Sequence, residues 1–411
     1  MAPLLPSFGH CSRHFGDSGP AGPDVQCHMA DATRYHRLQL LLTLLGVGLS
    51  IAYPLALVLT GGGHGLAGWA ARVSSARWVQ VALVALALGA GHAALTLPLK
   101  MIRGFWLPRR FGLLHQPLPS WLGDQLKAAV IVGVLTLAAI EIVYALLVLT
   151  PRWWLVAAAV FIAAEIAMTA VLPIWIVPLF YRLTPLADRG LRDRLLALAR
   201  RAGVAAVGVF VADHSRKSRT ANAAVVGLGR TRRIIFFDTL LSEFSPDEIE
   251  AVLAHELGHH AHGDMRRGLL VNGTLTLVTT GLAALCLELG VTLLGLAGPG
   301  DPAGLPWLAL VTLALGLGQL PLTNGFSRWI ERQADDFALA TTDNAAAFVG
   351  AMERLAALNL AERRPSRLKE IFLYSHPALD RRIARAEGAR RGASSGWDAG
   401  RGATADRGGV A

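Results

Sequence analysis

The chain has 411 residues, of which 53% are hydrophobic and 17% charged, and its formal net charge is +10. Its mean hydropathy of +0.44 argues against an ordinary soluble protein and favours long apolar segments. Basic residues flank those segments, so we attribute the charge to orientation in a lipid bilayer and expect no nucleic-acid partner. The three cysteines show neither metal-site nor disulfide spacing.

The N-terminal segment, residues 1–35, combines Gly, Pro, Ser and His without apolar periodicity, and we expect it to be disordered. It lacks the basic start and the short apolar core of a signal peptide. Met29 is an alternative start position. Residues 391–411 are a low-complexity tail rich in Gly, Ala and Arg, and we expect this tail to be disordered too.

Six apolar runs are each long enough to cross a bilayer, which takes a helix of about 20 residues. A buried soluble helix is the alternative for any one run, but six together favour membrane spans. Four runs fall in an N-terminal membrane region, residues 36–180, and two in residues 268–324. Pro173 and Pro178 predict a kink or break at the end of the fourth span. The runs comprise residues 38–60, 78–98, 128–149, 153–180, 268–296 and 305–324.

Basic residues are distributed unevenly among the connecting segments. The loop after the second span and the segment after the fourth are rich in Lys and Arg, whereas the other three loops contain only Arg72, Arg77 and Arg152. The positive-inside rule therefore places both termini and residues 181–267 in the cytosol. Strand-forming stretches in that segment predict a small mixed domain, and residues 325–390 are predicted to form cytosolic helices. The predicted strands cover residues 207–213, 222–229 and 232–238.

The stretch "SPDEIEAVLAHELGHHAHGD" (245–264) contains a group of histidines that could bind a metal. Its first four residues form a capping box with proline at the first helical position, so a helix begins there. On that helix His255 and His259 are four residues apart and project from one face. This is the H-E-x-x-H pattern, in which two histidines bind zinc and Glu256 acts as general base. A solvated, His-rich turn is the alternative.

His262 lies seven residues after His255 and returns to the same helix face. Three ligands on one straight helix would be spread too far along its axis, so we favour a third ligand from elsewhere and keep His262 as the alternative. His260 points away from this face. The segment "NGFSRWIERQADDFALA" (324–340) places Glu331 and Asp335 one helical turn apart, so Glu331 could bind zinc while Asp335 hydrogen-bonds a ligating histidine. An ordinary charged helix face is the alternative.

Taken together, "AHELGHHAHGD" and "SRWIERQADDFA" resemble the M48 metallopeptidases, which include the Ste24 CAAX prenyl proteases and the HtpX-type quality-control proteases. HtpX-type chains usually place two spans before H-E-x-x-H, whereas this chain places four, which favours the Ste24 branch. Further segments similar to that branch are "LPIWIVPLFYRLTPL" (172–186), "NAAVVGLGRTRRIIFFDTLL" (222–241), "SHPALDRRI" (375–383) and, more loosely, "RRFGLLHQPLPSWLGDQLK" (109–127).

The resemblance implies a gluzincin site with one zinc ion per chain and Glu256 activating a water molecule. The implied zinc ligands are His255, His259 and Glu331. It further implies that His376 stabilises the oxyanion, the negatively charged oxygen of the transition state, and that Arg382 supports the site. His376 and Pro377 could instead merely start a helix.

By the same resemblance, Asn222 and Ala223 on the strand-forming segment 222–229 contact the peptide substrate, which adds to that strand in extended form. Two features depart from the family. The chain has one span fewer than the eukaryotic enzymes, and Ala224 replaces an aromatic residue, so the substrate preference of this strand is open.

We therefore expect a mainly α multi-pass membrane protein with a small cytosolic α/β zincin-like protease domain. The expected function is zinc-dependent cleavage of membrane-associated or prenylated CAAX-type peptides. An HtpX-like quality-control protease and a non-enzymatic membrane scaffold are the alternatives, and the intact Glu256 and ligand set argue against the scaffold. The Arg-, Ala- and Gly-rich composition suggests a bacterial inner membrane, with the active site facing the cytosol. The oligomeric state is left open.

Overall fold

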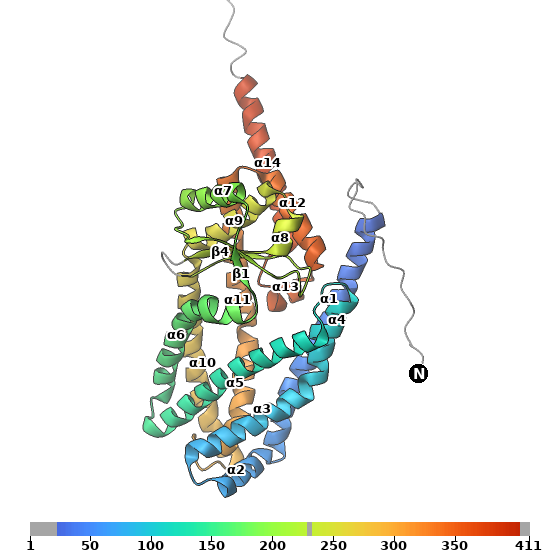
Figure 1. Ribbon diagram of the computed structural model, residues 1–411. Coiled ribbons are helices and arrows are strands. Elements are labelled where there is room, and N and C mark those ends of the chain that lie inside the picture. Colours follow the sequence, from blue (N-terminus) through green and yellow to red (C-terminus); the bar gives the residue numbers. More distant parts are fainter. Residues whose placement is uncertain (1–22, 228–231, 403–411) are drawn as a thin grey trace, which may run out of the picture.

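Long apolar helices form the N-terminal part of the protein in this computed structural model, which describes residues 23–227 and 232–402 (Figure 1). α3 packs against α1, α2 and α5, and α6 packs against α5. Short helical turns occur at Ile102–Trp106, where the helix is π-helical, and at α4 (Leu107–Arg110). The long helices are α1 (Pro23–Leu59), α2 (Gly62–Val73), α3 (Arg77–Met101), α5 (Leu118–Leu149) and α6 (Trp153–Val171).

Within the described residues, six helical segments are long and apolar enough to cross a membrane, as the sequence predicted. The predicted break at the end of the fourth span is confirmed. α6 ends at Val171 and continues as a π-helical turn, Leu172–Ile176, and a 3₁₀ turn, Val177–Leu179. Each turn contains a proline, which lacks the N–H that an α-helix requires. The six segments are Asp31–Leu59, Arg77–Arg110, Leu118–Leu149, Trp153–Val171, Asp264–Leu294 and Pro302–Thr342.

The two terminal segments differ from the sequence prediction of disorder over part of their length. Residues 23–35 form the first turns of α1, and residues 391–402 belong to α14 (Leu379–Gly402). Each stretch extends a helix that is already nucleated by its neighbouring residues, and adding residues to an existing helix costs less than starting one. The remainder of these predictions, at residues 1–22 and 403–411, lies outside the described residues.

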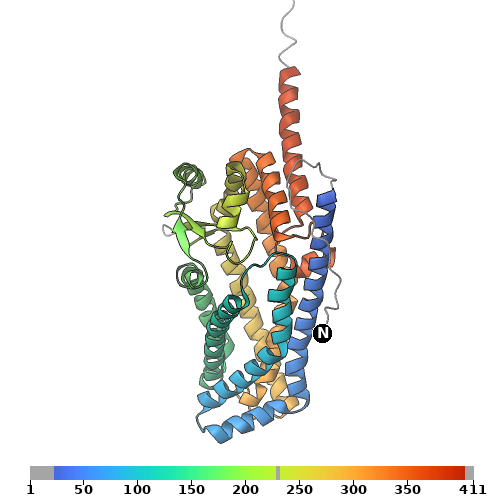
Figure 2. The ribbon, with the colours of Figure 1, turned by 45° about the vertical axis from the view of Figure 1, so that its right-hand side comes forward.

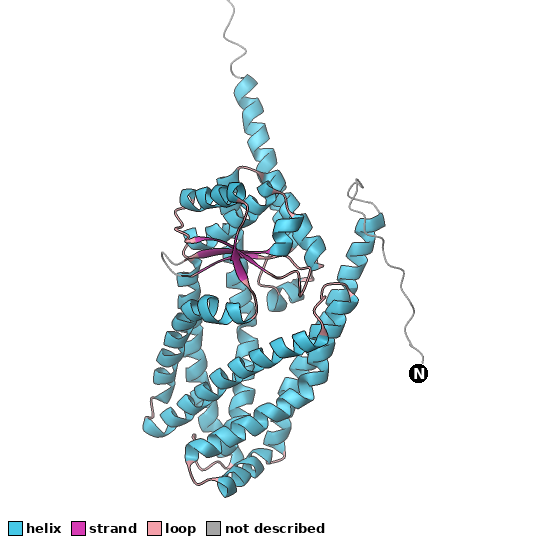
Figure 3. Ribbon diagram, viewed as in Figure 1, coloured by secondary structure: helices cyan, strands magenta, loops and turns pink. Residues whose placement is uncertain are grey.

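A small four-stranded sheet lies among the helices at one end of the molecule (Figure 3). The strand order is β1-β2-β4-β3, in which β2 and β4 are parallel and the other two pairs are antiparallel. Three of the strands coincide with the predicted stretches, while β1 was not predicted because it has only three residues. The sheet leaves β3 at an edge. The strands are β1 (Leu183–Pro185), β2 (Gly208–Ala212), β3 (Ala223–Val226) and β4 (Arg233–Phe237).

Two separate chain segments build the domain around this sheet. α7 (Arg189–Arg201), α8 (Asp238–Glu243) and α9 (Pro246–Ala261) come from the first segment, and α12 (Ala345–Asn359), α13 (Arg367–Leu373) and α14 from the second. Their apolar side chains share one hydrophobic core, in which Phe236 and Leu253 of the first segment are buried together with Phe348 of the second. In both views the domain sits at one end of the long helices, opposite α2 (Figure 2).

α11 (Leu305–Thr342) joins the membrane region to this domain as one continuous helix, although the sequence suggested a boundary at residue 324. α10 (Asp264–Leu294) likewise begins three residues after α9. A cavity of about 470 Å³ lies among the long helices, and Glu165 and Asn272, which line it, hydrogen-bond at 2.9 Å. The domain around the sheet therefore connects directly to the long apolar helices.

Candidate active site

α9 carries the H-E-x-x-H residues, and its local structure is as the sequence predicted. Ser245 accepts a hydrogen bond from the Glu248 backbone N–H, and Glu248 accepts one from the Ser245 N–H, which completes the capping box. A Cβ added at Gly258 would lie 3.1 Å from the Ala334 Cα, so the absence of a side chain there lets α9 and α11 pack closely. This close packing places Glu331 of α11 opposite the two histidines.

His255, His259 and Glu331 form a group whose ligand atoms all lie within 4.8 Å of one another. His255 Nε2 is 3.3 Å from Glu331 Oε2, and His259 Nε2 is 3.6 Å from Glu331 Oε1. Two atoms bound tetrahedrally to zinc at about 2.0–2.1 Å are separated by roughly 3.3 Å, so the spacing suits this metal. The structure therefore brings together the three ligands that the resemblance implied.

Each histidine is oriented by a buried carboxylate on its other ring nitrogen. Asp335 lies 2.9 Å from His255 Nδ1, and Asp264 lies 2.9 Å from His259 Nδ1. Because an ionised carboxylate can only accept a hydrogen bond, each Nδ1 carries a proton, and in the neutral imidazole, the form that binds a metal, each Nε2 presents a lone pair. Both lone pairs then point toward Glu331. Asp335 had been predicted in this role; Asp264 had not.

The arrangement fits a cation. Glu331 Oε2 is buried and has no hydrogen-bond partner, although His255 Nε2 faces it at 3.3 Å. Burial alone would lower the pKa of His255, but the carboxylates of Asp335 and Glu331 outweigh burial and raise it to about 9. The pocket thus favours positive charge between these atoms. Two imidazoles and a carboxylate are a donor set typical of catalytic zinc.

Arg382 on α14 fastens Asp335 in place. Its guanidinium donates to both carboxylate oxygens, Nη2 to Oδ1 at 2.6 Å and Nε to Oδ2 at 2.9 Å. Such a bidentate pair fixes orientation as well as charge. Arg382 Nη2 also lies 3.4 Å from His255 Nδ1, so Arg382 contacts the ligand group directly as well as through Asp335, consistent with the supporting position that the resemblance implied.

Glu256, between the two histidines, is partly buried on α9. Burial raises the pKa of its carboxyl group, while the neighbouring histidines oppose the shift. A general base works best when its pKa approaches the working pH, so the direction of this shift suits proton transfer.

His376 lies in the segment between α13 and α14, with its Nε2 3.2 Å from Glu331 Oε1 and its Nδ1 2.9 Å from the Ser375 hydroxyl. Its side chain is 57% exposed, so it borders both the ligand group and solvent. α14 begins at Leu379, two residues beyond Pro377. The alternative of His376 as a helix-start residue with Pro377 in the first position therefore lacks support.

The remaining histidines of the stretch lie outside the ligand group found among the described residues. His260 Nε2 is 2.9 Å from the Val225 carbonyl oxygen of β3. His262 packs edge-on against Phe337, with ring centroids 5.7 Å apart. Neither side chain points at Glu331, which agrees with the preference for a third ligand from elsewhere in the chain.

The edge strand β3 presents backbone groups beside α9. The Phe237 N–H donates to the Asn222 carbonyl at 3.0 Å, and the register pairs Ala223 with Phe236. Hydrogen-bonded pairs alternate along antiparallel strands, so Ala223 and Val225 direct their backbone groups to the free edge. The Asn222 side chain accepts from the Ala223 N–H at 3.0 Å. The part of the predicted strand at residues 228–229 lies outside the described residues.

Two contacts of the site were missed by sequence reasoning. Asp264 holds His259 from a position only five residues along the chain, and its place just after the Gly263 helix break was an available signal. Asn359, at the end of α12, bonds both backbone groups of Ala221 immediately before the edge strand. No local pattern marks that contact, because it joins residues 138 positions apart.

Comparison with known proteins agrees with this geometry. Residues 185–390 match the model of peptidase family M48, and residues 26–182 match one described as CAAX prenyl protease N-terminal, five membrane helices. In the second region this chain has four helices that are long enough to cross a membrane, since α2 has only 12 residues.

The uncharacterized metalloprotease YhfN of Bacillus subtilis (strain 168) is 28% identical over 373 residues, covering 90% of this chain and 87% of that protein. CAAX prenyl protease 1 of Saccharomyces cerevisiae is 38% identical over 172 residues, covering 40% and 36%. The crystal structure of S. mikatae Ste24p shares the fold, with a TM-score of 0.78 at 23% identity over 87% of this chain and 89% of that one. Both the membrane region and the protease domain thus match family models. This chain belongs to peptidase family M48, as a membrane metalloprotease of its Ste24 branch.

Proposed function

We propose that this protein is a zinc metalloendopeptidase that holds one zinc ion between His255, His259 and Glu331. The observation that supports the metal site most directly is that three electron-pair donors face one another at close range. Two imidazole Nε2 atoms face the carboxylate of Glu331, one of whose oxygens is buried without a hydrogen-bond partner. Such atoms repel one another unless a cation lies between them. Asp335 and Asp264 keep the lone pairs directed at that point.

In the proposed reaction Glu256 is the general base. A bound zinc ion would act as a Lewis acid toward the scissile carbonyl and lower the pKa of water. The Glu256 carboxylate accepts a proton from the attacking water and then delivers it to the leaving amine. Its position between two histidines on α9 places it beside the ligand group, and its raised pKa makes it a stronger base for accepting the proton from water.

We assign the oxyanion donor to His376. When the Ser375 hydroxyl donates to Nδ1, Nε2 carries the proton and can donate to a substrate oxygen that gains negative charge. Nε2 lies 3.2 Å from Glu331, so a substrate carbonyl near the metal would be within reach. Arg382 supports the site by holding Asp335 and by lying against His255.

For substrate binding we propose that an extended peptide adds to the free edge of β3. Ala223 and Val225 offer backbone groups there, and Asn222 orients the start of the strand. Backbone pairing is largely independent of side chains, so specificity would come from neighbouring surfaces. The Val225 carbonyl is engaged by His260, which leaves the Ala223 carbonyl and the Val225 N–H on that edge to pair with a peptide.

As substrates we propose membrane-associated peptides, including prenylated CAAX-type peptides. Relatives named CAAX prenyl protease 1 match this chain, and continuous α11 places Glu331 on the same helix as the sixth candidate span. The loop charges favour a cytosolic active site in what we propose to be a bacterial inner membrane.

The deciding experiment compares wild type with Glu256→Gln, both purified in detergent. We expect both to bind one zinc ion per chain and to have the same melting temperature, while only wild type cleaves a peptide. Farnesylated and unlipidated forms of the same CAAX peptide then test the substrate class. Wild-type cleavage rates in Glu256→Gln would refute the mechanism. Cleavage of unfolded membrane proteins, with neither peptide cleaved, would instead support quality control.

A further inference from the structure

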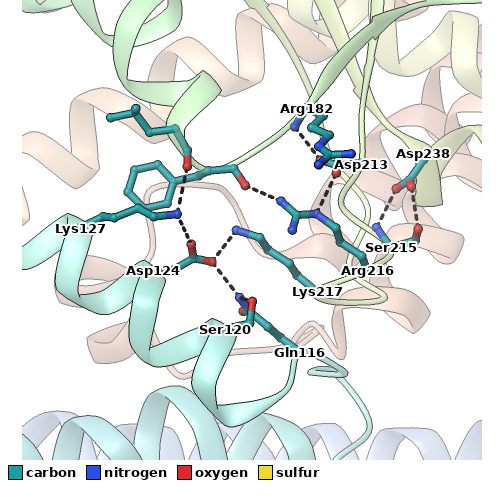
Figure 4. A network of polar contacts seen from close by, with 12 residues as sticks. Gln116, Ser120, Asp124, Lys127, Arg182, Asp213, Ser215, Arg216, Lys217 and Asp238 are labelled. Carbon is teal, nitrogen blue, oxygen red and sulfur yellow. Dashed lines mark hydrogen bonds and ion pairs between the residues drawn. The ribbon is translucent and has the colours of Figure 1, made fainter.

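Three segments from different parts of the chain meet beside the sheet, at the junction of the membrane region and the protease domain (Figure 4). They are the loop 113–116 with the first turns of α5, the residues 179–182 that follow the fourth span, and the loop 213–219 between β2 and β3. Arg216 in this last loop donates to the Phe180 carbonyl at 2.9 Å. The loop that leads into the edge strand thus contacts both membrane-side segments.

A buried ion pair lies at the centre of this junction. Lys217 Nζ is 2.6 Å from Asp124 Oδ2, and its side chain is only 8% exposed. The same carboxylate accepts hydrogen bonds from Gln116 at 2.7 Å and from Lys127 at 3.2 Å. The ring of Tyr181 lies 4.6 Å from the Lys217 ammonium. A charge buried this deeply is stable only while its partner stays in place, so the pair resists separation.

Backbone hydrogen bonds extend the contact along the chain. The N–H groups of His115 and Gln116 donate to the Lys217 carbonyl at 2.8 and 3.1 Å, and the Arg219 N–H donates to the Leu113 carbonyl at 3.2 Å. Leu114 and Ser218 form an isolated antiparallel bridge. Lys217 and its neighbours therefore form a short two-stranded contact with the membrane-side loop.

From this contact the chain reaches the edge strand within five residues. The Thr239 hydroxyl donates to the Thr220 carbonyl at 2.7 Å, and Asn359 bonds both backbone groups of Ala221, the residue before Asn222. The conformation of this connection is constrained, because nearly every residue between Lys217 and Asn222 is hydrogen-bonded. A displacement at Lys217 would accordingly shift the start of β3.

We infer that the Lys217–Asp124 ion pair is a positioning contact, which fixes the edge strand β3 against the membrane region and so places the peptide that pairs with it. This inference rests on the proposed role of β3 in substrate binding. Neither residue touches the metal-ligand group, so the contact acts on peptide affinity and leaves the chemical step alone.

The test uses full-length enzyme in detergent and an extended fluorogenic peptide that the wild type cleaves. Lys217→Met removes the charge and keeps a long apolar side chain. We expect it to raise KM by up to about 100-fold, which corresponds to the full stabilisation that such a charged hydrogen bond gives the folded protein. The kcat and the metal content should stay close to wild type. Asp124→Asn should raise KM at least as much, because it leaves the ammonium group buried and unpaired.

Lys127→Met is the matched control. Lys127 bonds the same carboxylate but is 51% exposed, and its other hydrogen-bond partner is the Leu179 carbonyl and not a residue of loop 213–219, so its loss should leave KM unchanged. The double variant Lys217→Met/Asp124→Asn should raise KM by less than the product of the two single fold-changes, because both changes remove one interaction.

The outcomes separate this inference from the proposed function. If wild type does not cleave any peptide, the proposed function fails and the inference fails with it. If wild type cleaves but Lys217→Met has an unchanged KM, the inference alone is overturned. Loss of metal and kcat with an unchanged KM would indicate a merely structural pair and would also overturn it. Should Asp124→Asn not fold, Lys217→Met against Lys127→Met decides the question.

Discussion

Removing Asp335 should weaken both metal binding and folding, for two distinct physical reasons. Asp335 orients His255 at 2.9 Å, and loss of such a partner typically costs about 10- to 100-fold in metal affinity. It also neutralises Arg382, whose side chain is 11% exposed. Removing one partner of a buried ion pair costs about 3–5 kcal/mol. Asp335→Ala should therefore have both a lower metal affinity and a lower folding stability.

Asp264→Ala is the matched comparison. Asp264 orients His259 at the same 2.9 Å distance, so metal affinity should fall by a similar factor. Its cationic neighbour is Arg267, which is 40% exposed and can turn toward water. Asp264 itself is buried, but its removal leaves no cation unpaired in the interior, so the folding cost should be smaller than that of Asp335→Ala, about 1 kcal/mol. The two variants should match in metal affinity and differ in stability.

The assay measures the two quantities separately. Zinc affinity is obtained by competition with a chromogenic chelator in detergent. Folding stability is measured on metal-free protein, because bound metal would itself raise the apparent stability. The double variant Asp335→Ala/Arg382→Met should recover part of the lost stability without recovering metal affinity.

Two results would refute this reasoning. Equal destabilisation of metal-free Asp335→Ala and Asp264→Ala would show that the Arg382 ion pair does not govern stability here. Wild-type zinc affinity in both variants would show that the carboxylates do not orient the ligand histidines.

Three further predictions follow from the structure. His376→Ala should keep its zinc and melting temperature but lose about 10²–10³ in kcat, the cost of one oxyanion donor; an active variant would remove that role. Burial lowers the pKa of His214 from 6.5 to about 4, so its folded form stays neutral while the unfolded chain gains a proton. Acidification from pH 6.5 to 4 should then cost about 3 kcal/mol of stability; denaturant midpoints that fall equally in His214→Gln and wild type would contradict this. Reporters fused after residue 64 or 300 should report the non-cytosolic side and one after residue 115 the cytosol; a cytosolic signal at 64 would invalidate the first span.

Local patterns in the sequence determined the elements of this protein. The capping box at Ser245 and the four-residue spacing of His255 and His259 depend on hydrogen bonds and angles within one helix, so they are readable without tertiary contacts. The apolar runs predicted the membrane helices for the same reason, since length and hydropathy are local properties. Two prolines likewise marked the end of the fourth span.

Only the tertiary structure decided which of several charged groups meet. The sequence did not show which charged residues of the segment 324–340 belong to the site, because Arg332 and Asp336 lie beside Glu331 and Asp335. The close packing of α11 against α9 at Gly258 determines that Glu331 and Asp335 face the histidines. The strand order that leaves β3 at an edge depends on pairing between distant segments. The Lys217–Asp124 contact joins residues 93 positions apart. Such contacts form only when the whole chain is packed, because no local periodicity encodes the partner of a side chain.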